Sequence, residues 1–427
     1  MARAKKETAL TPEERLQAAL VPDWEWPYKL PENWCWVYAP HIFDIEYGKG
    51  LPTKQLSDTG YPVFGANGQI GFYSEYMYKE PQALMSCRGA YSGTMNKSLP
   101  YSYVTSNSLI ISSPRGLMGT DCIYYLFSAL NVSELISGTA QPQVTVQAFD
   151  GFPIPLSPLA EQQRIVDRIE SLFAKLDEAK EKAQAVVDSF ETRKAAILHK
   201  TFTGELTAKW REEHGVSIDN WKTTRFDSVA AIRSNLVDPA EYQSFPHIAP
   251  DNIEKKTGVL LEYHTIAEDG VTSGKHRFYS GQILYSKIRP YLSKAVVVDF
   301  DGLCSADMYP IEAYQNARCL WYYMLSDEFL LQASTAGSRS VLPKINQKEL
   351  SALTVHLPTN DREQEEIARI LDELFDKEQQ TKEAAEAVLD QIDLMKKSIL
   401  ARAFRGELGT NDPSEESAVE LLKRTIL

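Results

Sequence analysis

Residues 161–206 read EQQRIVDRIESLFAKLDEAKEKAQAVVDSFETRKAAILHKTFTGEL, and residues 363–408 read EQEEIARILDELFDKEQQTKEAAEAVLDQIDLMKKSILARAFRGEL. The two stretches align without a gap at a constant offset of 202 residues, and 19 of 46 positions are identical. Upstream, Asn33-Trp34 before the first copy is echoed by Asn220-Trp221 before the second. The chain is therefore predicted to consist of two units, each a globule followed by one long helix.

In each copy the apolar residues recur at alternating spacings of four and three, which is the heptad pattern of a coiled coil. Arg193 interrupts this seam in the first copy, and Glu378 and Thr381 interrupt it in the second. Neither copy contains proline, and the one glycine of each, Gly204 or Gly406, stands where a helix stop is expected. The predicted seam residues are Ile165, Ile169, Leu172, Leu176, Ala179, Ala183, Val186, Phe190 and Ile197, then Ile367, Leu371, Leu374, Ala385, Val388, Ile392, Met395 and Ile399.

The two helices are predicted to run antiparallel. Only residues 207–219 separate the first helix from the second globule, so that globule begins close to the end of the first helix. The second helix starts from this globule and has to bury its seam, and the equivalent seam in the chain runs back along the first helix. We expect an intramolecular, pseudo-twofold coiled coil. The alternatives are that each helix packs on its own globule, or that the seam joins two copies of the chain.

The two globules differ from the helices in amino-acid composition. They are rich in Tyr, Val, Ile, Gly, Pro and Ser, which favours short strands with irregular loops and an α+β fold of two mixed α/β domains. The predicted division of the chain is an N-terminal extension at 1–29, a first globule at 30–157, a first helix at 158–210, a second globule at 217–358, a second helix at 359–408 and a C-terminal tail at 409–427.

Bulk composition excludes several classes of protein. No run of about 18 apolar residues exists, and the charged N-terminus lacks an apolar segment behind it, so neither a membrane span nor a secretory signal is expected. The five cysteines are scattered and never form a CxxC pair, and the seven histidines are dispersed. This pattern indicates a cytoplasmic protein without disulfides and without a metal site.

The net charge of -13 at first speaks against nucleic acid as a partner. Residues 359–408 alone, however, carry 8 basic against 13 acidic residues, so much of the acidity lies on a solvated helix. In the second globule the basic residues gather within twenty positions instead. They are Lys275, His276, Arg277, Lys287, Arg289 and Lys294.

Sequence motifs for catalysis are missing. There is no Asp/Asn-Pro-Pro-aromatic motif for amino methylation, no glycine-rich strand-turn-helix for a methyl-donor cofactor and no GxxxxGK[ST] loop for a nucleotide. Pro250-Asp251 followed by Glu254-Lys255-Lys256 looks like a nuclease set, but its carboxylates are too close in sequence to come from adjacent strands, and a turn is the better interpretation. We expect no catalysis, no cofactor and no metal in this chain.

Short motifs in a fixed order point to a family. Together with the two unlike globules and two like helices, they resemble the specificity subunit of type I restriction-modification systems. The motifs are Leu30-Pro31-Glu32-Asn33-Trp34, the stretches 61–71 and 87–93, the stretches 245–253 and 281–290, and the strand-proline endings at 152–156 and 354–358.

Residues 1–29 depart from that family's pattern, because they precede its usual Leu-Pro start. They contain a helix-prone piece at 11–20, with Thr11 as its expected cap and Pro12 at its first position. We expect this extension to dock on the assembled complex.

The resemblance implies a mechanism. Each globule would be a target recognition domain that reads one half of a bipartite target in double-stranded DNA, and the helices would set the gap between the halves. Two modification subunits would bind S-adenosylmethionine and methylate adenine. A restriction subunit would use ATP and Mg to translocate and cleave DNA. The specificity subunit itself would perform none of this chemistry.

In the first globule the candidate DNA-binding residues lie in two glycine-containing turns. Direct readout needs Arg or Lys for guanine and Asn or Gln for adenine, whereas phosphates need amides and cations. The turn at 65–68 is either a loop at the groove or a plain hairpin, and Arg88 is either a DNA contact or an ordinary surface arginine. The candidates are Gly65, Asn67, Gly68, Arg88, Tyr91 and Ser92.

In the second globule the candidates come from the basic cluster and from a later loop. Lys287, Arg289 and Tyr291 would alternate along a strand and face either DNA or solvent. The loop 337–344, with small residues and cations followed by Asn346-Gln347, is our candidate for base contact. The candidates are Lys275, Arg277, Lys287, Arg289, Tyr291, Ser338, Arg339, Lys344 and Asn346.

Two rival functions remain open at this point. One is a solitary methyltransferase or nuclease, which a methylation assay of the purified chain would reveal. The other is a coiled-coil adaptor with two protein-binding heads, which would explain the acidic charge equally well. The adaptor would bind DNA duplexes without the steep salt dependence of a DNA-binding protein.

Overall fold

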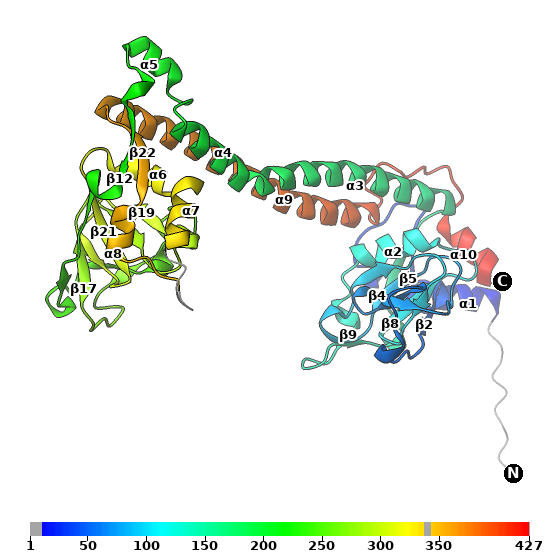
Figure 1. Ribbon diagram of the computed structural model, residues 1–427. Coiled ribbons are helices and arrows are strands. Elements are labelled where there is room, and N and C mark those ends of the chain that lie inside the picture. Colours follow the sequence, from blue (N-terminus) through cyan, green and yellow to red (C-terminus); the bar gives the residue numbers. More distant parts are fainter. Residues whose placement is uncertain (1–10, 337–342, 427) are drawn as a thin grey trace. The chain divides into compact units, whose positions relative to one another are not determined.

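The repeated segments are helical in the computed structural model, which describes residues 11–336 and 343–426. The first segment forms α3 (Leu159–Asp188) and α4 (Phe190–Phe202), and the second forms the single helix α9 (Asp361–Ala403) (Figure 1). The chain divides into two compact units, one of Met1–Ala183 with Ala387–Leu427 and the other of Gln184–Glu386. Each unit holds one globule and a part of both helical segments.

The first helix breaks at Ser189, where one continuous helix was expected. The Ser189 hydroxyl donates to the carbonyl of Ala185 at 2.6 Å, and the Arg193 guanidinium donates to the carbonyl of Val186 at 3.2 Å. Side chains that bond to the carbonyls of the preceding turn compete with the helical hydrogen bonds and bend the helix. The interruption of the seam at Arg193 therefore lies one turn beyond the break.

Pairing between the helices is antiparallel within each unit, as predicted. In the first unit, Lys180 pairs with Asp393 at 3.1 Å and Lys396 pairs with Asp177. As the residue number falls from 180 to 177 on the first helix, that of the partner rises from 393 to 396 on the second. Only an antiparallel arrangement gives this order. In the second unit, Arg193 and Glu378 form an ion pair at 2.7 Å. The polar residues that interrupt the two seams thus pair with each other.

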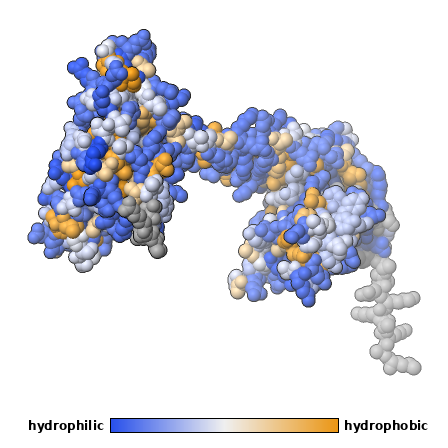
Figure 2. All heavy atoms as spheres, in the orientation of Figure 1, coloured by the Kyte–Doolittle hydropathy of each residue, from blue (hydrophilic) through white to orange (hydrophobic). Residues whose placement is uncertain are grey.

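The apolar seam is narrower than the heptad pattern predicted. Ala385 and Ile392 are buried seven residues apart, but Val388 and Met395, also seven apart, are 41% and 49% exposed. These two residues were wrongly assigned to the seam. In this part of α9 the heptad stripe is therefore covered on one flank only. Hydrophilic residues cover most of the visible face of the helices (Figure 2).

The first globule contains four sheets and one α-helix, α2 (Thr120–Ala129). β1 (Cys35–Tyr38) pairs with β11 (Pro153–Leu156) and leads into α3, while the small ladder of β9 (Ile136–Ser137) and β10 (Gln143–Val144) lies apart. An antiparallel sheet has the order β2 (Asp44–Tyr47), β8 (Ser108–Ser112), β5 (Ala83–Ser86) and β6 (Met95–Lys97). The other has the order β4 (Gly68–Tyr73), β3 (Tyr61–Gly65) and β7 (Tyr103–Val104).

The second globule repeats this plan. β12 (Trp221–Arg225) pairs with β22 (Thr354–Pro358), and α6 (Ala317–Met324), α7 (Asp327–Ala336) and α8 (Gln347–Ala352) accompany the sheets. One antiparallel sheet has the order β13 (Ala230–Ile232), β21 (Met308–Ala313), β18 (Ile283–Ser286) and β19 (Ala295–Val297). The other has the order β14 (Leu236–Val237), β17 (Lys275–Phe278), β20 (Gly302–Cys304), β15 (Pro246–Ile248) and β16 (His264–Thr265).

The two globules share one topology although their sequences are almost unrelated. The sheet β2-β8-β5-β6 corresponds strand for strand to β13-β21-β18-β19. The amide of Ser86 donates to Thr94 at 2.8 Å, and the amide of Ser286 donates to Lys294 at 2.9 Å, so even the loop between the last two strands closes alike. The duplication therefore extends through the globules, and the mixed α/β domains with paired helices agree with the predicted fold class.

The N-terminal extension packs on its own unit. Thr11 caps α1 (Pro12–Ala19) in a capping box with Glu14, as predicted. Ala19 and Val21 are buried in the core of the first globule, beside Leu422 of α10 (Ala418–Ile426). Docking of this extension on other subunits stays a prediction. Within the described residues, no helix is long and apolar enough to cross a membrane.

Candidate nucleic-acid interface

The predicted turn at 65–68 is a tight hairpin that joins β3 to β4. Gly65 pairs with Gly68, which has a φ of +75°, and Asn67 is exposed between them. A Cβ at Gly65 would lie 3.1 Å from the side chain of Ile70, a tight contact that this exposed isoleucine could relieve by a small movement. Hydroxyls from neighbouring strands fix the turn: Ser108 donates to the carbonyl of Gly65 at 3.0 Å, and Ser86 donates to that of Ala66. The hairpin is thus held against the end of β5.

Arg88 lies just beyond β5, next to this hairpin. It is exposed and occupies the N-cap position of a short 3-10 turn, Gly89–Tyr91, without a capping bond from its side chain, and Tyr91 is 49% exposed. Ser92 donates its hydroxyl proton to the carbonyls of Gly89 and Pro142 at 2.9 and 2.8 Å, so it could offer DNA only an acceptor. The structure therefore brings the two predicted motifs of the first globule together through Ser86.

The prediction of a strand through residues 287–291 is wrong. β18 ends at Ser286, and Pro290 opens a 3-10 turn, Pro290–Leu292. Proline lacks the N–H that a ladder needs and favours the first position of such a turn. Arg289, exposed and capping this turn, has a φ of 47°, a left-handed conformation that is costly for a residue with a Cβ. Tyr291, within the turn, is 48% exposed.

The later loop meets the Arg289 turn, as a shared DNA-binding surface requires. The amide of Arg289 donates to Pro343 at 2.8 Å, and the amide of Ile345 donates to Lys287 at 2.9 Å. Lys344 and Lys287 both approach Asp307, at 3.5 and 3.7 Å, so one carboxylate partly neutralises two of the predicted cations. Lys287 also donates to the carbonyl of Ala306 at 2.5 Å.

Four candidates have a structural role or lie outside the described residues. Asn346 caps α8, with its side-chain oxygen accepting from the amide of Glu349 at 2.9 Å. Lys275 is 7% exposed and donates to Ser273, and burial lowers its pKa. Ser338 and Arg339 lie outside the described residues. Among the described residues, the predicted cation cluster thus has buried, paired and unpaired members.

The two globules present one equivalent feature. In each, an exposed arginine begins a 3-10 turn between the last two strands of the four-stranded sheet: Arg88 between β5 and β6, and Arg289 between β18 and β19. We call these the Arg88 turn and the Arg289 turn. Sequence comparison missed this equivalence because the turns share only the serine before them and one exposed tyrosine, Tyr91 or Tyr291. It also missed Asn96, whose amide reaches the Ser86 hydroxyl at 3.4 Å behind the Arg88 turn.

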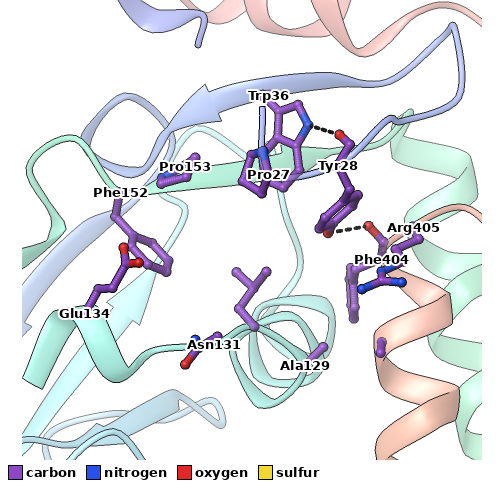
Figure 3. A pocket seen from close by; sticks show the side chains of 12 residues that line it. Pro27, Tyr28, Trp36, Ala129, Asn131, Glu134, Phe152, Pro153, Phe404 and Arg405 are labelled. Carbon is purple, nitrogen blue, oxygen red and sulfur yellow. Dashed lines mark hydrogen bonds between the residues drawn. The ribbon is translucent and has the colours of Figure 1, made fainter. Parts of the chain in front are cut away.

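A pocket in the first unit offers no catalytic set. It has a volume of about 360 Å³ and is lined mainly by apolar and aromatic side chains, with Glu134 and Arg405 at its edge (Figure 3). Tyr28 donates to the carbonyl of Phe404 at 3.0 Å, and burial raises the pKa of this tyrosine to about 12. Neither a nucleophile nor a poised base lies among the lining residues.

The cysteines offer no reactive thiol either. All of them are buried, and burial raises the pKa of Cys35 and Cys122 to about 12. In the described part of the chain, no cluster of His, Cys, Asp or Glu could hold a metal ion.

Comparison with known proteins agrees with the fold and the duplication. The family model of the type I restriction modification DNA specificity domain matches twice, at residues 31–187 and 218–389. The EcoDI specificity subunit of Escherichia coli is 34% identical over 408 residues, covering 89% of this chain and 90% of the relative. The EcoKI specificity subunit of Escherichia coli (strain K12) is 23% identical over 438 residues, again covering 89% and 90%.

Solved structures show the same fold. A chain from a study of complex assembly and conformational transition in a type I system superposes with a TM-score of 0.66 at 19% identity, over 90% of this chain and 100% of the other. The HsdS subunit of Thermoanaerobacter tengcongensis superposes with a TM-score of 0.57 at 19% identity and the same coverage. The twofold family match and the EcoDI likeness carry the assignment: the chain belongs to the type I restriction-modification specificity subunits and is the DNA sequence-recognition subunit of such a system.

Proposed function

We propose that each globule reads one half of a bipartite target in double-stranded DNA, with the Arg88 turn and the Arg289 turn against the duplex. The observation that carries this proposal is their equivalence. Two domains with almost unrelated sequences both place an exposed arginine in the same turn of the same sheet, at adjacent positions, because the amides of Gly89 and Arg289 make the equivalent bonds to Pro142 and Pro343. The packing of the globules explains a shared core, but it gives no reason for a shared exposed cation.

The surroundings of the two turns suit phosphate and base contacts. Gly89 has a φ of +78° and open space where a Cβ would stand, so a phosphate could approach its backbone closely. Arg289 is held in a left-handed conformation, and strain of this kind is concentrated at binding sites. Asn67 adds an exposed amide beside the Arg88 turn, and an amide can pair with the edge of adenine.

The remaining parts of the activity are assigned to partner subunits. In this proposal two modification subunits bind S-adenosylmethionine and methylate adenine, and a restriction subunit supplies ATP- and Mg-dependent translocation and cleavage. The chain itself is non-catalytic and acts in the cytoplasm. The paired helices set the gap between the half-targets. The family assignment favours this function over an adaptor with two protein-binding heads.

Arg88→Ala and Arg289→Ala in the assembled methyltransferase test the proposal. Each variant should weaken DNA binding, and each should affect one half of the target only. Loss of one phosphate contact should reduce the slope of log K against log salt by about 1. Lys287→Ala should have a smaller effect, because Asp307 and the carbonyl of Ala306 already engage this lysine.

Arg233→Ala is the matched control, since Arg233 is an exposed cation of the same globule that is paired with Glu312 at 2.7 Å. Wild-type affinity and salt slope in both turn variants would refute the assignment of these turns to the DNA interface.

A further inference from the structure

Arg277 stands apart from the Arg289 turn and is enclosed by aromatic rings. It lies on β17, and its guanidinium carbon is 4.9 Å from the ring centre of Tyr279, 5.4 Å from that of Tyr242 and 5.9 Å from that of Phe245. Such rings attract a cation through their quadrupole and restrict the plane of the guanidinium. The side chain is therefore held in place before any ligand arrives.

The guanidinium has no acidic partner in the described part of the chain. Its Nε is buried without a hydrogen bond, and neither an ion pair nor a side-chain hydrogen bond engages the rest of the group. Other arginines of the second unit are satisfied: Arg233 pairs with Glu312, Arg211 with Glu363 and Arg318 with Asp372. A half-buried, unpaired guanidinium is costly to maintain, which points to a partner outside the chain.

The first globule has an aromatic cluster at the corresponding place. β3 pairs with β7 in parallel as β15 pairs with β20, and the bridge between Tyr78 and Ser102 corresponds to the pair of Phe278 and Gly302. There the rings of Tyr61 and Tyr101 lie 4.9 and 5.2 Å from that of Tyr76, and all three tyrosines are exposed.

Both globules thus expose aromatic rings at this edge, but among the described residues a cation lies between the rings only in the second. A difference between two otherwise equivalent surfaces is expected where two domains read different bases. We infer that Arg277 reads a guanine in the half-target of the second globule. This inference rests on the proposed function and names one of its base contacts.

The chemistry matches a base better than a phosphate. A guanidinium offers a planar fork of donors, and guanine presents two acceptors, O6 and N7, side by side in the major groove. The aromatic enclosure fixes the plane of the fork, which reduces the entropy lost when both bonds form. A guanidinium can also form two bonds to a phosphate, but a fixed guanidinium plane is of most use against the flat edge of a base, whose acceptors lie in one plane.

The test is to map methylated adenines in cells that carry the complete methyltransferase with wild-type chain, Arg277→Ala or Arg277→Gln. Arg277→Ala should relax one guanine position in one half-target and lower affinity for that site by about 5- to 150-fold, the range of a good bidentate pair. Arg277→Gln should shift the preference at that position toward adenine, which glutamine can pair with. Arg233→Ala is the control and should leave the methylated sites unchanged.

Three results would overturn the inference. Unchanged methylated sites and affinity in both Arg277 variants would remove Arg277 from the interface. A uniform loss of affinity over all sequences, with a reduced salt slope and no relaxed position, would make it a phosphate contact. A lower melting temperature of both variants, with an unchanged target, would make it structural. Failure of the proposed function is a separate outcome, because the wild-type complex itself would then show no defined target.

Discussion

Glu161 and Glu363 hold the same position in the two helical repeats, and both are 0% exposed. In the first unit, Glu161 accepts from the indole of Trp34 at 2.7 Å and from Asn411 at 2.9 Å. In the second unit, Glu363 accepts from the indole of Trp221 at 3.0 Å and from the guanidinium of Arg211 at 2.8 Å. The tryptophans correspond, but the remaining donors come from different parts of the chain.

The two junctions are alike, but the segment that completes each one follows the buried glutamate in the chain in the first unit and precedes it in the second. In the first unit the C-terminal tail supplies Thr410 and Asn411, whereas in the second the segment after the first helix supplies Thr207 and Arg211. Only Glu363 accepts directly from a cation. Burial raises the pKa of Glu363, but hydrogen bonds from Asn220, Arg211, Thr207 and Trp221 outweigh it and lower the pKa.

The largest effect is expected from Glu363→Leu. This change leaves Arg211, 8% exposed, as an uncompensated buried cation, which costs about 3 to 5 kcal/mol of stability. Glu161→Leu leaves only neutral donors without their acceptor and should lower the stability by about 1 to 3 kcal/mol. Chemical denaturation of both variants measures the difference, with the exposed Glu181→Leu as control. Equal losses would show that the cation does not distinguish the two junctions.

Sequence patterns predicted the parts of this molecule that depend on periodicity and repetition. The antiparallel pairing followed from chain connectivity, and the interruptions at Arg193 and Glu378 proved to be partners. The strand through Arg289 failed because Pro290 ends the ladder. Asn346 was assigned to DNA because amides read adenine, but the same amide caps a helix, and only the fold decides between these uses.

The equivalence of the two Arg turns and the enclosure of Arg277 could not be read from the chain. Both depend on residues that are distant in sequence, and the two globules reach one topology through different residues. Long-range contacts of this kind produce no local periodicity, so they cannot be predicted from the composition of a short stretch of sequence.

The helix stops offer a second way to sharpen the comparison between the units. Gly204 and Gly406 both have a left-handed backbone, with φ of +81° and +74°. A Cβ would lie 2.6 Å from Ile218 at the first and 2.3 Å from Pro31 at the second. The end of an isoleucine side chain can move, but a proline ring is rigid. Gly406→Ala should therefore cost about 2 to 3 kcal/mol and Gly204→Ala about 1 to 2 kcal/mol.

Melting of both glycine variants tests this order. Gly116→Ala, at a left-handed position with open space, isolates the backbone contribution from the steric one. A larger loss at Gly204 than at Gly406 would show that the proline relaxes more readily than the isoleucine.

Two equivalent lysines predict a difference in pH dependence. Lys194 lies 5.5 Å from the ring centre of Phe375 and donates to the carbonyls of Lys256 and Thr257, and burial lowers its pKa to about 8. Lys396 lies 4.9 Å from the ring centre of Phe173, reaches solvent and pairs with Asp177.

Between pH 8 and the ordinary lysine pKa, the unfolded chain binds the proton that the folded state has lost, so stability rises with pH. Relative to Lys194→Met, the wild-type chain should gain about 2.5 kcal/mol between pH 7 and pH 10, which is roughly three quarters of what the full shift allows. Lys396→Met is the matched control. A flat difference between the wild-type chain and Lys194→Met over this range would contradict the burial of a lysine ammonium at this junction.

The smallest effect on stability, and the sharpest on function, is expected from lengthening the paired helices. An insertion after Leu206 is unsuitable, because it would displace Thr207 from its 2.8 Å bond with Glu363. Four residues added after Ala183 and four after Glu386, the boundaries of the two units, lengthen both helices at matching points and leave both junctions intact. Antiparallel pairing survives, since a four-residue insertion into a heptad pattern only unwinds it locally.

Four residues add about 6 Å and about 40° of rotation. This corresponds to between one and two base pairs at about 3.4 Å each. If the two units read separate half-targets and the helices set the gap, the gap in the methylated sites should grow by one or two base pairs while both half-sequences stay the same. Lengthening α9 alone is the control, because it breaks the register of the ion pair between Lys180 and Asp393 and should abolish methylation. An unchanged gap in an active double insertion would show that the spacing is set elsewhere in the complex.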